Sequence, residues 1–192
     1  MENSRELFEA DLHHALLAAS RAYGRDRFVV VGSAAILATH PDAPDYIRRS
    51  ADIDMFPLPA VEGPEMEKGD QLVGQGSVFE SEHDFYVERL GDWTMLTQPA
   101  GWMDRCVVVS TEGITGYCLH PLDLAYNKTE AGRAKDILYV AGLIHEGYLT
   151  APELKDFIRH HCPHEELRPG VLKNFAKVED ALHDMGGDSA QD

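Results

Sequence analysis

Two aspartates separated by one residue, Asp52 and Asp54, constrain the fold of this chain more than any other feature. They stand in the apolar run 51–56 and follow the pair Gly32-Ser33 by about twenty residues. The run predicts a strand, and alternation along a strand places both carboxylates on the same face. Two half-buried carboxylates at that spacing repel each other, so a divalent cation such as Mg²⁺ or Mn²⁺ is their simplest partner.

The segment before the aspartates predicts a site for phosphate groups. Residues 27–31 form a strand rich in valine, and a short helix is expected over 33–40. Gly32 allows a phosphate to approach the backbone, and Ser33 stands at a helix start, where anions are favoured. Helix N-capping is the alternative role for Ser33. The order strand, Gly-Ser, helix and Asp-x-Asp strand therefore predicts a site for a metal-bound triphosphate.

This order of motifs resembles the nucleotidyltransferase superfamily of the DNA polymerase β type, whose pattern is Gly-Ser or Gly-Gly followed by Asp-x-Asp. Residues 48–54 are similar to the Arg-x-Ser-x-Asp-x-Asp of the toxin-side nucleotidyltransferases of type IV toxin–antitoxin and abortive-infection systems. A second block, 120–136, is similar to the His-Pro-x-Asp-Leu, Lys and Ala-Gly-Arg-x-Lys-Asp elements of small bacterial nucleotidyltransferase-like proteins. The resemblance covers roughly residues 27–150.

The resemblance implies a nucleotidyltransferase fold of the α/β (α+β) class, with a short mixed β-sheet and a C-terminal helical portion. The catalytic residues that it implies are Asp52, Asp54, Glu88 and Lys128. The nucleotide-binding residues that it implies are Gly32, Ser33, Arg48, Ser50 and Lys128. The implied ligands of Mg²⁺ or Mn²⁺ are Asp52, Asp54 and Glu88.

A third carboxylate, which acts on the attacking hydroxyl in most active members of the superfamily, is expected from residues 83–91. Asp84 and Glu88 share the face of the expected strand with Tyr86. Glu88 fits the family position better, although an aspartate is more usual there. The alternative role for Glu88 is that of an exposed carboxylate beside Arg89.

The second block supplies charged residues on two successive helices. Lys128 is expected to neutralise the triphosphate as a compact positive charge. Arg133 and Asp136 are three residues apart on the next helix, a spacing that allows an ion pair. We interpret that pair as a structural clasp between helices, with a role in the site as the alternative.

The hydrophobic pattern divides the chain into a nucleotidyltransferase core (1–120), a helical portion (121–185) and a disordered tail (186–192). The expected helices are 4–23, with a capping box from Asn3 and Glu6, then 33–40, 121–131, 133–147, 151–161 and 169–184. The expected strands are 27–31, 51–56, 83–90, 105–110 and 113–119. The Gly- and Pro-rich residues 57–77 are expected to form a long linker or mobile insertion, with or without a short helix.

Composition narrows the partners and the compartment. The net charge of −16 repels nucleic acid over most of the surface, so an RNA substrate would need a local basic patch. The candidates for that patch are Arg21, Arg25, Arg27, Arg48 and Arg49. Three widely spaced cysteines predict a reducing cytoplasm, and no membrane-spanning or signal-peptide pattern is found.

The sequence therefore predicts metal-dependent transfer of a nucleotidyl group from an NTP to an acceptor hydroxyl. The resemblance leaves the acceptor open among RNA, a protein side chain and a small molecule. It also implies a toxin–antitoxin or phage-defence setting, with a cognate antitoxin as a partner. Two alternatives stay open: a nucleotide-binding regulatory module that keeps the fold without turnover, acting as a toxin–antitoxin partner, and a nucleotide sensor.

Overall fold

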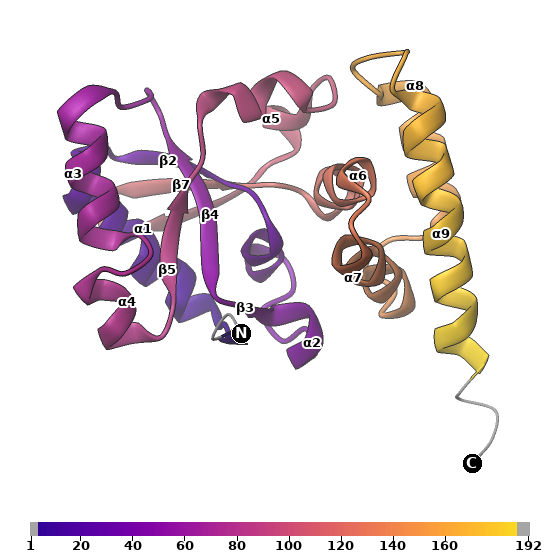
Figure 1. The fold of residues 1–192 in the computed structure, drawn as a ribbon, viewed down its shortest axis with the longest axis horizontal. Helices are drawn as coiled ribbons and strands as arrows, with labels where there is room; N and C mark the ends of the chain where they lie inside the picture. The colour runs from indigo at the N-terminus through magenta and orange to yellow at the C-terminus, as the bar shows by residue number, and fades with distance from the viewer. Residues whose placement is uncertain (1–3, 188–192) are drawn as a thin grey trace. The chain divides into compact units, whose positions relative to one another are not determined.

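The structure, a computed structural model, describes residues 4–187. These residues divide into two compact units (Figure 1). The first unit contains the chain up to Leu96 together with Met103–His120. The second contains Thr97–Trp102 together with the chain from Pro121 onward. No helix in the described part of the chain is long and apolar enough to cross a membrane.

A five-stranded mixed sheet lies at the centre of the first unit, in the order β5-β4-β2-β7-β6. The strands are β2 (Arg27–Val30), β4 (Asp52–Pro57), β5 (Tyr86–Arg89), β6 (Val107–Thr111) and β7 (Ile114–Cys118). β4 is antiparallel to β2 and parallel to β5, while β7 is parallel to β2 and antiparallel to β6. The strand expected over 83–90 is shorter, because α4 (Val78–His83) occupies its beginning.

Helix α1 (Glu9–Tyr23) packs on the sheet through its apolar stripe. Leu16 occupies the space above Gly116 of β7 where a side chain would otherwise lie. The expected start of this helix at residue 4 was wrong, because α1 begins at Glu9 and Glu6 belongs to a strand. The side chain of Asp11 accepts a hydrogen bond from the backbone N–H of Phe8, the N-cap residue, at 2.8 Å. Asn3, the other member of the expected capping box, lies outside the described residues.

The N-terminal strand β1 (Arg5–Glu6) pairs antiparallel with β3 (Arg49–Ser50). β3 follows the short helix α2 (Asp45–Arg48) and leads directly into β4. The helix expected over 33–40 is a shorter 3₁₀ helix, η1 (Ser33–Ala38). This arrangement connects the start of the chain to the residues immediately before the Asp-x-Asp strand.

The expectation of a linker over 57–77 was wrong, because helix α3 (Gly63–Val73) occupies most of it. Pro64 stands in the first turn of α3, where its missing N–H is tolerated. Gly69 faces the ring of Tyr23, and a Cβ at this position would overlap that ring. The glycine therefore serves close packing of α3 on α1, although in the sequence it resembles a flexible position.

The second unit is helical. Its principal helices are α6 (Pro121–Ala131), α7 (Ala134–His145), α8 (Ala151–His161) and α9 (Arg168–Gly187), which pack against one another. Two short helices, η2 (Asp92–Thr97) and α5 (Trp102–Arg105), lie in the connection between β5 and β6. α9 includes the first two residues of the tail expected over 186–192, and the rest of that tail lies outside the described residues. The mixed sheet and the C-terminal helices confirm the α+β class.

Candidate active site

Three carboxylates project from one face of the sheet, on the neighbouring strands β4 and β5. Asp54 lies opposite Glu88 in the parallel register, and Asp52 lies opposite Tyr86. Residues opposite each other in a sheet point to the same face, as do residues two apart on one strand. Asp52, Asp54 and Glu88 therefore share a face, while the buried Ile53 points to the other.

Gly32 places the turn after β2 directly against Asp54. Its φ of +63° lies in the left-handed region, which favours glycine. A Cβ built on Gly32 would overlap the carboxyl group of Asp54. The position therefore needs glycine for two reasons, the positive φ and the lack of space for a Cβ. With glycine there, the backbone lies in close contact with the Asp54 carboxylate.

Hydroxyl groups join Asp52 to the same turn. Ser33 Oγ donates to Ser50 Oγ at 3.3 Å, and Ser50 Oγ donates to Asp52 Oδ1 at 2.8 Å. Gly32 is the N-cap residue of η1 and Ser33 is the first residue of that helix, so Ser33 does not take the N-cap position considered for it. Both aspartates thus face the Gly32-Ser33 turn, as strand alternation predicted.

Glu88, and not Asp84, accompanies the two aspartates. Asp84 ends α4 with a φ of +59°, before the strand begins, so the expectation that it shares the strand face was wrong. Burial raises the pKa of Glu88, and the negative charges of Asp52 and Asp70 raise it further, against the opposing charge of Arg89. The carboxyl of Glu88 therefore belongs to a crowded acidic group.

The side chains of this face fit a hard divalent cation, because they offer carboxylate oxygens, which Mg²⁺ and Mn²⁺ prefer. Within residues 4–187, no three His, Cys, Asp or Glu side chains are grouped so that they could hold a metal ion. Asp52, Asp54 and Glu88 therefore share a face without forming such a group.

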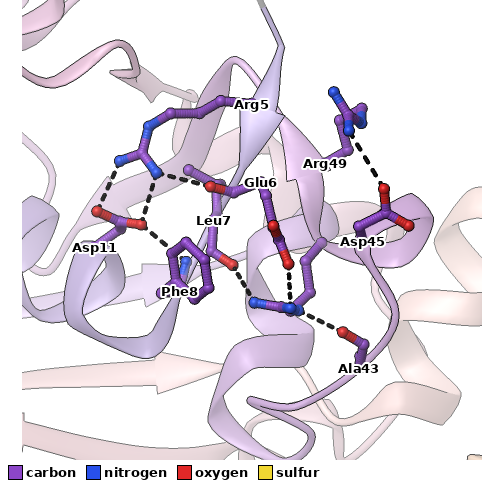
Figure 2. A network of polar contacts seen from close by, with 9 residues as sticks. Arg5, Glu6, Leu7, Phe8, Asp11, Ala43, Asp45 and Arg49 are labelled. Atoms are coloured by element: carbon purple, nitrogen blue, oxygen red, sulfur yellow. Dashed lines mark hydrogen bonds and ion pairs between the residues drawn. The ribbon is translucent and has the colours of Figure 1, made fainter.

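Groups of the first unit bind the side chain of Arg48. Its partners Glu6, Leu7 and Ala43 are labelled in Figure 2. Its guanidinium pairs with Glu6 and donates to the backbone carbonyls of Ala43 and Leu7, and it lies over the ring of Phe8. Only 11% of its side chain is exposed. These contacts hold β1 beside the segment that enters β3, and the nucleotide contact expected of Arg48 stays a prediction.

In the second unit, Lys128 lies 3.3 Å from Asp136, whose side chain is fully buried. Arg133 immediately precedes α7 and pairs with the same carboxylate. Burial alone would raise the pKa of Asp136, but hydrogen bonds from Arg133 and the charge of Lys128 hold this pKa below its usual range. The clasp between α6 and α7 is thus made by Lys128, because Arg133, the N-cap residue of α7, pairs with a residue in the first turn of that same helix.

Carboxylates or carbonyls occupy most of the arginines proposed as a basic patch. Arg27 lies 3.9 Å from Asp26, and Arg49 lies 3.3 Å from Asp45. Arg25 donates to a backbone carbonyl of the loop after β4 at 3.2 Å. The carboxylate partners of Arg27 and Arg49 lower the positive charge that the segment offers to a nucleic acid.

Arg89, Asp70 and Tyr23 form a polar network on the other face of β5, which the sequence did not predict. Arg89 donates to both oxygens of Asp70, at 2.7 and 3.0 Å, and the hydroxyl of Tyr23 donates to the same carboxylate at 2.8 Å. Burial raises the pKa of Tyr23, and the hydrogen bond to Asp70 adds to this. Asp70 lies on helix α3, which was not predicted because the segment is rich in glycine.

A family model described as "Nucleotidyltransferase of unknown function (DUF6036)" matches residues 5–159. The match spans both the carboxylate face in the first unit and the Lys128–Asp136 pair in the second. No curated protein and no solved structure matches the chain.

Proposed function

We propose that this chain, which belongs to the family of nucleotidyltransferases of unknown function, catalyses metal-dependent transfer of a nucleotidyl group from an NTP to an acceptor hydroxyl. One observation carries the proposal: Asp54 and Glu88 lie in register on parallel strands, with Asp52 on the same face. The turn at Gly32 comes close enough to Asp54 to leave no room for a side chain. Carboxylates and an open backbone turn are thus adjacent, as a metal-bound triphosphate requires.

Each residue of this face has a role in the proposal. Asp52 and Asp54 would hold Mg²⁺ or Mn²⁺, with Glu88 as the third acid. A bound cation would neutralise phosphate charge during the transfer. The Gly32-Ser33 turn receives the phosphates. The acceptor oxygen bonds to the α-phosphorus as the bond to pyrophosphate breaks, and Glu88 takes the proton of the acceptor hydroxyl.

The acceptor class and the setting follow from the resemblance of residues 48–54 and 120–136. We propose an RNA, a protein side chain or a small molecule as the acceptor, in a toxin–antitoxin or phage-defence setting with a cognate antitoxin. In that proposal the protein acts in the cytoplasm. From the same resemblance we propose that Lys128, which pairs with Asp136, neutralises the triphosphate.

A second candidate function is a nucleotide-binding regulator without turnover, acting as a nucleotide sensor or a toxin–antitoxin partner. The observation that favours it is that no three acidic, histidine or cysteine side chains of residues 4–187 are grouped to hold a metal ion. A glutamate also stands where the superfamily usually has an aspartate. In that case the protein binds an NTP with a divalent cation and transfers nothing.

Labelled-NTP transfer separates the two functions. Each of the four NTPs, labelled at the α-phosphate, is incubated with the protein, Mg²⁺ or Mn²⁺, and total cellular RNA or protein. Label should appear in one acceptor class and vanish in the double variant Asp52→Asn with Asp54→Asn. The variant Asp84→Asn, which changes a neighbouring carboxylate off the strand, should keep the activity. Binding of NTP without label transfer to any acceptor would favour the regulator.

A further inference from the structure

We propose that Ser50 is a positioning residue whose hydroxyl fixes the Asp52 carboxylate for cation binding, rather than a residue that contacts the nucleotide. This proposal rests on the proposed function, since it concerns the same carboxylate face. It reassigns a serine for which the resemblance implied a nucleotide contact.

A serine hydroxyl has one proton to donate and two lone pairs that accept. Ser50 gives its proton to Asp52 Oδ1 at 2.8 Å and accepts the proton of Ser33 at 3.3 Å. It therefore has no second proton for a phosphate oxygen. A nucleotide contact by donation from Ser50 would require it to release Asp52.

The backbone of Ser50 is held in place from the N-terminal strand. Ser50 lies opposite Arg5 in the antiparallel pair of β1 and β3. Next to this pair, the N–H of Leu7 donates to the carbonyl of Arg48 at 3.1 Å. The guanidinium of Arg48 adds the contacts to Glu6, Leu7 and Ala43. Ser50, which donates the hydrogen bond to Asp52, thus lies on a strand whose backbone is paired with β1.

A fixed donor matters for a carboxylate that must bind a cation. Without a partner, the carboxyl group of an aspartate turns freely about its terminal bond, and that freedom is lost when a cation binds. A hydrogen bond to one oxygen removes this freedom in advance. Such supporting partners of metal ligands change affinity or activity about 10–100-fold when they are removed.

Binding of Mn²⁺ alone, without nucleotide, provides the test. Free Mn²⁺ is followed by electron paramagnetic resonance during titration of the wild-type protein and of Ser50→Ala. We expect about 10–100-fold weaker Mn²⁺ binding in Ser50→Ala. Ser50→Thr, which keeps a hydroxyl, should bind close to the wild-type level. Ser81→Ala, which removes a hydroxyl that donates to a carbonyl in α4, is the matched control and should bind normally.

Two further variants separate failure of this proposal from failure of the proposed function. Ser50→Cys keeps the volume with a weaker donor and should bind Mn²⁺ with intermediate affinity, which guards against an unfolded alanine variant. Asp52→Asn should lose most of the binding. If Asp52→Asn loses Mn²⁺ while Ser50→Ala and Ser50→Cys bind as the wild type does, the positioning role is overturned and the metal site stands. Normal binding by Asp52→Asn would overturn the metal site itself.

Discussion

Asp54 and Glu88 lie directly opposite each other on the parallel strands β4 and β5, although the helices α3 and α4 separate them in the chain. A parallel pair needs a long crossover connection, so the two residues cannot meet through a tight turn. Their register decides which acidic residue of the segment 83–91 joins the aspartates. This strand register cannot be predicted from the spacing of the sequence motifs alone.

The first prediction concerns this third carboxylate. Glu88→Gln removes the acceptor for the hydroxyl proton while keeping the shape of the side chain. We expect the rate of nucleotidyl transfer, kcat, to fall about 10²–10⁴-fold, the usual contribution of a general base. NTP affinity should change much less than the rate, because Asp52 and Asp54 still hold the cation. The rate is measured with the acceptor class found in the labelling experiment.

Asp84→Asn is the matched control for Glu88→Gln. Asp84 ends α4 in the left-handed conformation, which asparagine also tolerates, so folding should be unaffected. An equal loss of rate in Asp84→Asn and Glu88→Gln would contradict the assignment of the third acid to the strand β5.

The second prediction uses two glycines with the same φ but different ψ angles, 37° at Gly24 and −171° at Gly32. Gly24 and Gly32 both have a φ of +63°, but only Gly32 has a carboxylate where a Cβ would lie. Gly24→Ala should cost about 1–2 kcal/mol of unfolding free energy, the penalty for a left-handed alanine, and keep cation binding. Gly32→Ala should cost more and displace Asp54, so cation binding should be lost. Urea unfolding and Mn²⁺ titration measure both; normal Mn²⁺ binding by Gly32→Ala would argue against the site.

Local rules predicted much of the carboxylate face. Alternation along β4 placed Asp52 and Asp54 together, because the side-chain period of a strand is independent of the rest of the fold. The Gly-Ser turn was likewise predicted from residues that adjoin one another. The position of Glu88, by contrast, came from family resemblance, because the pairing of two distant strands leaves no signal in either strand alone.

The errors have physical causes in long-range packing. The residues 57–77 looked like a linker because of their glycines, yet Gly69 is needed for the contact with Tyr23. The helix expected over 4–23 includes the strand β1, because a strand of two residues has no detectable periodicity. Its partner β3 lies far along the chain. The partner of Lys128 was missed because two helices had to be packed before Asp136 came within reach.

The third prediction concerns the stability of the second unit. Lys128→Ala should lower the unfolding free energy by about 1.5–3 kcal/mol, the range for hydrogen bonds to charged groups, because Lys128 is only 16% exposed. Arg133→Ala should cost less, about 0.5–1 kcal/mol, because 62% of that side chain is exposed and water screens its pairing. Urea unfolding measures both. The reverse ranking would contradict the assignment of the clasp to Lys128.

The fourth prediction follows from the lowered pKa of Asp136. Its ionised form is favoured in the folded state, so the stabilisation is complete above the ordinary carboxyl pKa of about 4. It is lost as the pH falls below that value and through the folded pKa. Asp136→Asn should therefore be less stable than the wild type at pH 7, with a difference that shrinks below about pH 4. A difference independent of pH would contradict the ionised pairing.

The last prediction tests whether nucleotide and cation bind together. A ligand at ten times its Kd stabilises the native state by about 1.4 kcal/mol, or roughly 3–6 °C in the Tm of a chain this size. An NTP should raise the Tm only with Mg²⁺ or Mn²⁺ present, because Asp52 and Asp54 otherwise repel the phosphates. The double variant Asp52→Asn with Asp54→Asn should lose this dependence on the cation. Without ligands, its own Tm should rise as the carboxylate repulsion is relieved. A Tm that no NTP changes with either cation would argue against both the transferase and the regulator, because each requires an occupied site.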